Sequence, residues 1–119
     1  MIQMDSTAVF VGMIGGLRNV ADAIAPVLQT QWHEVNDSSS HRMEADTPHY
    51  WVSLFKHEYS DDRDMQFTKF PFELGVYTHN DAVRVAAARE MFERLKALNV
   101  PLMLVDAVQT KLDEWHPTQ

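Results

Sequence analysis

The clearest hydrophobic pattern lies between Met65 and Leu98, where an alternating segment runs almost directly into an amphipathic one. Alternate side chains of an extended strand point to opposite faces of a sheet. One face of the predicted strand is apolar and carries Phe70, Phe72, Leu74 and Val76. The other face is mixed and carries Phe67, Lys69, Glu73 and Tyr77. Pro71 and Gly75 indicate that the strand lies at an edge or contains a bulge.

The segment that follows has the periodicity of a surface helix. Its apolar positions are spaced three or four residues apart, at Val83, Ala87, Met91, Leu95 and Leu98. Its outward positions are charged, at Arg84, Glu90, Glu93, Arg94 and Lys96. Asn80 or Asp81 is suited to cap the first turn, and Asn99 is suited to end the helix. We therefore expect the apolar stripe of this helix and the apolar face of the strand to form the core together.

The remaining patterns predict further strands and helices. Thr7–Ile14 is a short apolar run before two glycines, which is typical of a buried strand, and Leu17–Leu28 has helical spacing. His49–Tyr59 alternates and predicts a second strand, whose Tyr50, Val52 and Leu54 face away from its Trp51, Phe55 and Tyr59. Leu102–Val105 predicts a closing strand, and Gln109–Trp115 a last short helix.

Two polar segments connect these elements. Trp32–Pro48 contains Asn, Asp and three consecutive serines, so we expect a long connection that is opened by a short strand at Trp32–Val35. Ser60–Asp64 is rich in turn-forming and charged residues, and it should join its flanking strands as an antiparallel hairpin.

The predicted element order is β-α-β-β-α-β, which is the ferredoxin-like order. We therefore expect residues 1–119 to form a single α+β domain, in which two helices cover one face of an antiparallel sheet. The opposite face would then be open and aromatic, with Trp51, Phe55, Tyr59, Phe67 and Tyr77 on it and His57 beside them.

Composition narrows the possible chemistry. The chain has no cysteine, which excludes disulfides, thiolate metal sites and cysteine nucleophiles. Met1–Ser6 has no basic residue, and no apolar run approaches membrane-spanning length, so we expect a cytoplasmic protein that does not enter a membrane.

Charge points to a basic partner. The net charge is −7, and the segment from His33 to Asp64 contains eight acidic residues against three basic ones. A protein that binds nucleic-acid phosphates needs clustered lysine and arginine, so a nucleic-acid partner is disfavoured. An acidic surface instead speeds encounter with a basic protein and discriminates against other partners.

No motif in the sequence specifies a metal, a cofactor or a catalytic residue. The acidic residues Glu58, Asp61, Asp62 and Asp64 lack the spacing and central glycine of a calcium loop, so solvated charge explains them better than metal binding. The six histidines form no compact ligand pair. Gly12, Gly15 and Gly16 lack the lysine of a phosphate-binding loop and suit a tight turn. We expect no enzyme activity and no cofactor.

The open face is the candidate site, because exposed aromatic residues supply much of the energy at protein interfaces. The candidate partner-binding residues are Trp51, Phe55, His57, Tyr59, Asp61, Asp62, Asp64 and Glu73. Two alternatives leave these aromatics without a binding role. Either the C-terminal segment with Leu112 and Trp115 covers them, or a second copy of the chain does.

The segments FTKFPFELGVYT, MFERLKAL and VPLMLVDAVQTKLDEW together form an acidic and aromatic α/β pattern over about residues 50–115. This pattern resembles immunity proteins of bacterial toxin systems, especially those of contact-dependent growth inhibition. The resemblance implies a cytoplasmic inhibitor that binds a cognate toxin domain, often a nuclease, and blocks its active site or substrate surface. The alternative is a dimeric ferredoxin-like domain that encloses a small-molecule site, either regulatory or enzymatic. A stable homodimer that buries Trp51 and Phe55 would favour that alternative.

Overall fold

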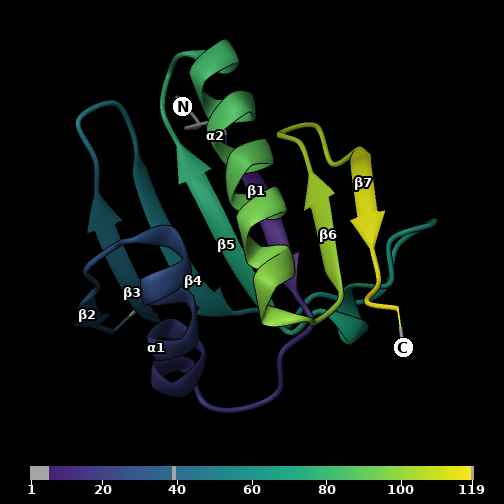
Figure 1. The fold of residues 1–119 in the computed structure, drawn as a ribbon, viewed down its shortest axis with the longest axis horizontal. Helices are drawn as coiled ribbons and strands as arrows, with labels where there is room; N and C mark the ends of the chain where they lie inside the picture. Colours follow the sequence, from purple (N-terminus) through teal and green to yellow (C-terminus); the bar gives the residue numbers. More distant parts are fainter. Residues whose placement is uncertain (1–5, 39, 119) are drawn as a thin grey trace.

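Seven strands form one antiparallel sheet in the computed structural model, which describes residues 6–38 and 40–118 (Figure 1). The strands are β1 (Ser6–Val11), β2 (His33–Asn36), β3 (His41–Asp46), β4 (Trp51–Lys56), β5 (Phe72–Tyr77), β6 (Leu102–Val105) and β7 (Lys111–Trp115). Their order across the sheet is β2-β3-β4-β5-β1-β6-β7. Helices α1 (Leu17–Leu28) and α2 (Asp81–Leu95) lie side by side on one face (Figure 1). Two short 3-10 helices are η1 (Phe67–Lys69) and η2 (Lys96–Leu98).

The predicted α+β class with an antiparallel sheet and two helices is confirmed, but the sheet is larger than the four strands expected. The predicted connection Trp32–Pro48 is mostly the hairpin of β2 and β3, which extends the sheet beyond β4. The short strand predicted at Trp32–Val35 corresponds to β2, but β3 was missed, because only its Met43 and Ala45 are buried. The predicted helix Gln109–Trp115 is also wrong, because most of it is edge strand β7, paired with β6.

The strand predicted in the opening pattern begins later than expected. Met65, Phe67 and Phe70 precede β5 in a segment that contains η1, and regular pairing starts at Phe72. β5 lies between β4 and β1 and keeps continuous register through Gly75, so the expected edge position or bulge is wrong. Pro71 stands just before the strand, where its missing N–H interrupts no ladder.

The main core lies between the sheet and the two helices. The sheet contributes buried side chains that include Val9, Val11, Leu54, Phe72, Leu74 and Val76. Ala87, Met91 and Leu95 of the predicted helical stripe are buried as expected. Arg84 was predicted to face outward but is only 5% exposed, because its guanidinium is held by Thr7 Oγ1, the Thr78 carbonyl and the Asp81 carboxylate.

The connection between β4 and β5, residues 57–71, covers part of the other face of the sheet and passes to the side of β6 and β7 (Figure 1). It brings Met65, Phe67 and Phe70 against apolar side chains of β1 and β6. This second cluster consists of Ala8, Phe10, Met65, Phe67, Phe70, Met103 and Val105. The face opposite the helices is therefore covered at β1 and β6 and uncovered towards β4 and β3.

The part of the chain that the structure describes contains no helix long and apolar enough to cross a bilayer. The segment Met1–Ser6, on which the expected cytoplasmic location partly rests, lies outside the described residues except for Ser6.

Candidate functional site

An aromatic pair occupies the uncovered part of the sheet. The rings of Trp51 on β4 and Tyr77 on β5 stack with their centroids 4.1 Å apart and their planes 14° from parallel. Phe55 lies four residues after Trp51 on β4, so its side chain is on the same face of the sheet. Like Trp51 and Tyr77, it is partly exposed. We call Trp51, Phe55 and Tyr77 the open aromatic surface.

Gly75 explains why this pair lies flat on the sheet. A Cβ atom at this position would stand 2.8 Å from the Tyr77 hydroxyl oxygen, which is closer than real Cβ contacts allow. The glycine therefore leaves room for the Tyr77 ring against the backbone of β5. Burial and the charge of Glu73 raise the pKa of Tyr77 to about 12, so its hydroxyl stays protonated at neutral pH.

The strand next to the open aromatic surface is charged. Arg42 on β3 donates to the Glu44 carboxylate at 2.7 Å, which partly neutralises both groups. Asp46 lies directly across from Trp51 in the register of β3 and β4 and is exposed. We call Glu44 and Asp46 the acidic margin of the open aromatic surface.

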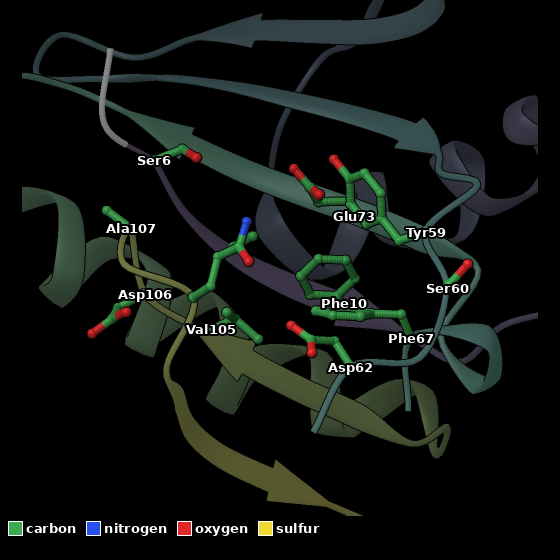
Figure 2. A pocket seen from close by; sticks show the side chains of 12 residues that line it. Ser6, Phe10, Tyr59, Ser60, Asp62, Phe67, Glu73, Val105, Asp106 and Ala107 are labelled. Atoms are coloured by element: carbon green, nitrogen blue, oxygen red, sulfur yellow. The ribbon is translucent and has the colours of Figure 1, made fainter. Parts of the chain in front are cut away.

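A pocket of about 570 Å³ opens where the connection leaves the sheet (Figure 2). Its apolar lining comes from Ala8 and Phe10 of β1, Phe67 of the connection and Val105 of β6. Its polar lining includes Ser6, Tyr59, Ser60, Asp62, Glu73 and Asp106. The pocket therefore has an aromatic and aliphatic floor with several carboxylates and hydroxyls around it.

Glu73 is the most unusual group in this pocket. It is only 7% exposed, and its carboxyl group lies beside the Tyr59 hydroxyl (Figure 2). Burial raises the pKa of Glu73 from 4.5 to about 7, and a hydrogen bond with Tyr59 partly opposes this rise. Burial and the nearby Glu73 charge raise the pKa of Tyr59, so the phenol remains a donor. A carboxyl group that titrates near neutral pH can exchange protons or pair with a cation.

His57 holds the start of the connection in place. It is 8% exposed, and its two ring nitrogens contact the Phe70 carbonyl and the backbone N–H of Tyr59. Nε2 must carry the hydrogen and donate to the carbonyl, since Nδ1 accepts from Tyr59 at 3.0 Å. Burial lowers the pKa of His57, which favours this neutral form. Neither ring nitrogen is left to offer to a partner.

The three acidic residues of the predicted hairpin lie in the connection and have separate surroundings. Asp61 accepts hydrogen bonds from the backbone N–H and the hydroxyl of Thr68, at 2.9 and 2.8 Å, and these bonds lower its pKa. Asp64 pairs with Lys111 of β7 at 3.6 Å. Asp62 lines the pocket. Asp61 thus stabilises the connection internally, and Asp64 ties it to β7.

The structure therefore divides the predicted site residues into groups. Trp51 and Phe55 belong to the open aromatic surface, whereas Tyr59, Asp62 and Glu73 line the pocket. The C-terminal strand does not cover the aromatics, because Trp115 packs against the main core on the helix side. Ser6 and Asp106 also line the pocket, and no pattern in the sequence indicated them, because they are brought there by the pairing of β1 with β6 and by the turn after β6.

No cluster of three or more metal-binding side chains occurs among the described residues. Comparisons of the sequence with protein-family models and with curated proteins find no match, and a comparison with solved structures finds none either. The function must therefore be inferred from the open aromatic surface and the pocket.

Replacing Glu73 by Gln should stabilise the protein at neutral pH. The folded protein holds the proton of Glu73 up to about pH 7, whereas the unfolded chain releases it near pH 4.5. The free energy of unfolding of the wild type therefore falls by up to about 3 kcal/mol as the pH rises from 4.5 to 7, and it stays at the lower value above pH 7. Urea unfolding at pH 4, 7 and 8 should show the Glu73→Gln advantage growing with pH. The exposed Glu58→Gln control should stay within about 0.5 kcal/mol of wild type at each pH.

Replacing His57 by Ala should destabilise the protein by about 2–3 kcal/mol, because the buried Phe70 carbonyl and the partly buried Tyr59 N–H lose their partner. The lowered pKa of His57 also means that wild-type stability declines as the pH falls through 6.5, and the variant should lack this contribution. Urea unfolding measures both effects. Exposed His49→Ala is the control, and an equal loss in the two variants would contradict the anchoring role of His57.

Proposed function

We propose that this chain is an immunity-type inhibitor that acts in the cytoplasm and neutralises a toxin domain by direct protein contact. The observation that carries the proposal is the open aromatic surface beside an acidic margin and an acid-lined pocket. The resemblance of residues 50–115 to immunity proteins of contact-dependent growth inhibition supports the same class.

The charge of the chain indicates what kind of toxin domain it would bind. A net charge of −7 attracts a basic surface over a distance of about a Debye length, which raises the rate of encounter. Nuclease domains are basic where they bind nucleic acid, so an acidic inhibitor suits the substrate surface of a nuclease. Charge of this kind gives speed and selectivity, while buried aromatic side chains give most of the affinity.

The residues have different proposed roles. Trp51, Phe55 and Tyr77 would be the hydrophobic anchors, since they are partly exposed and held rigidly on strands. Asp46 at the acidic margin and Asp62 in the pocket lining would supply exposed negative charge. Among the other predicted partner-binding residues, Tyr59 and Glu73 would act through the pocket, and His57, Asp61 and Asp64 by fixing the connection.

A second candidate is a ferredoxin-like domain that binds or converts a small molecule as a dimer. In this reading β4-β5-β1-β6 is the four-stranded ferredoxin-like part, and the other strands extend it. The observation that favours it is the 570 Å³ pocket with its buried carboxyl group, because this volume is typical of small-molecule sites. A stable homodimer at micromolar concentration that buries Trp51 and Phe55 would select this candidate over the inhibitor.

Co-expression with the toxin fragment encoded immediately upstream tests the inhibitor function. We expect the wild-type chain to restore growth and to form a complex with that fragment. Trp51→Ala should weaken this complex at least tenfold, as expected for an aromatic anchor. Val85→Ala, on the exposed side of α2, should leave it unchanged. Failure of the wild-type chain to bind the fragment or restore growth would reject the proposed function.

The acidic margin predicts a specific electrostatic effect. Asp46→Lys should slow association with the toxin fragment by about tenfold at low ionic strength, and added salt should reduce the difference. Asp22→Lys changes the net charge equally but lies on exposed α1, on the helix side, so it should have a much smaller effect. Stopped-flow association rates measure both. Equal slowing by the two variants would place the interface elsewhere.

A further inference from the structure

We propose that the pocket between β1, β5 and the connection is a binding site for an alkylammonium group, with Glu73 as its counter-ion and aromatic rings as its walls. This inference concerns the pocket alone and does not depend on a toxin partner. It rests on three features of the pocket, which are its aromatic lining, its buried carboxyl group and the distribution of charge around it.

Three aromatic rings line the pocket and contact one another. The ring centroids of Phe10 and Phe67 are 4.9 Å apart, and Tyr59 lies 5.8 Å from Phe67 and 6.2 Å from Phe10. The faces of aromatic rings carry partial negative charge and attract cations, so groups of such rings are suited to ammonium ligands. Ala8 and Val105 add aliphatic surface, which suits the carbon chain of an alkylammonium ion.

Glu73 lacks a positively charged partner. Among residues 6–38 and 40–118, no lysine, arginine or histidine forms an ion pair with it, and its one side-chain partner is Tyr59. The Tyr59 hydroxyl can satisfy only one of the several acceptor positions of a carboxylate. A buried carboxylate without a cation is costly, so a ligand that brings a positive charge would remove a cost already present in the folded protein.

The remaining charges around the pocket favour the same ligand. Asp62 from the connection and Asp106 from the turn after β6 line it, and none of the basic side chains that the structure describes does. Figure 2 shows the Asp62 carboxylate across the pocket from Glu73. An anionic ligand would meet only negative charge, and a neutral apolar ligand would leave the Glu73 carboxyl group unpaired. An ammonium group on a short carbon chain satisfies both the charged and the apolar lining.

The protonation state of Glu73 should control binding. Its pKa of about 7 means that the carboxylate form increases roughly tenfold between pH 6 and pH 8. The other titratable groups that face it are Tyr59 and Asp62 of the connection, Asp106 of the turn and Tyr77 on the same strand, with His57 behind Tyr59. Any pH dependence that these groups cause would persist when Glu73 is replaced by Gln.

Titration with n-butylammonium, followed by NMR of the aromatic protons, tests the proposal with the intact chain. We expect saturable shifts at Phe10, Tyr59 and Phe67, and an affinity that increases by up to about tenfold from pH 6 to pH 8. Glu73→Gln should reduce the affinity at pH 8 at least about tenfold and remove most of the pH dependence. Asp22→Asn on α1 removes one charge outside the pocket and should bind as wild type does.

Three results would overturn the proposal. These are absence of saturable binding, equal binding by wild type and Glu73→Gln, and equal binding of neutral n-butanol, which would mark an apolar cavity only.

A second experiment identifies the source of the ammonium group. Binding of an acetylated Gly-Lys-Gly amide peptide at least as tight as n-butylammonium assigns the pocket to lysine side chains of a protein. Binding of n-butylammonium alone assigns it to free amines. Retained n-butylammonium binding without toxin neutralisation would reject the proposed function and not the pocket.

Discussion

The uncovered face of the sheet is the constraint on which the other features depend. Both helices pack on one side, so the seven-stranded sheet must bury or use the apolar side chains on its other side. The connection from residue 57 to residue 71 covers this side at β1 and β6, because its Met65, Phe67 and Phe70 pack on Ala8, Phe10 and Met103. His57 fixes where this cover begins by linking the end of β4 to the Phe70 carbonyl. The pocket and the open aromatic surface lie where the cover ends.

Strand β5 shows how one alternating pattern gives side chains different roles. Glu73, Gly75 and Tyr77 all belong to its face away from the helices. Glu73 lies at the margin of the cover and is buried beside Tyr59, which raises its pKa. Gly75 carries no side chain, so Tyr77 lies over it and stacks on Trp51. On this face, the position of Glu73 and Tyr77 relative to the connection determines which of the two is buried.

Local periodicity predicted those parts of the structure in which one face is clearly apolar. Phe72, Leu74 and Val76 face the helices, and Ala87, Met91 and Leu95 meet them, as the two patterns indicate. The strands β3 and β7 were missed because few of their side chains are buried: β3 buries only Met43 and Ala45, and edge strand β7 buries none. Phe67 and Phe70 continue the apolar pattern of the strand but lie outside the sheet, because η1 and Pro71 precede the ladder, which starts at Phe72.

The candidate site was harder to predict than the fold, because its properties arise from contacts between distant segments. Glu73 was expected to be an exposed charge, whereas the arrival of Tyr59 and the apolar side chains of the connection buries it. Arg84 was also expected to be exposed and is also buried, but its charge is compensated within the fold by Asp81, and Thr7 accepts a further hydrogen bond from it. The contrast between these two buried charges is informative. Arg84 has an acidic partner within the fold, whereas Glu73 is left to be neutralised by a proton or by a bound cation. A proton and a cation compete for the same carboxylate, so occupancy of the pocket would lower the pKa of Glu73 and restore stability that its burial removes at neutral pH.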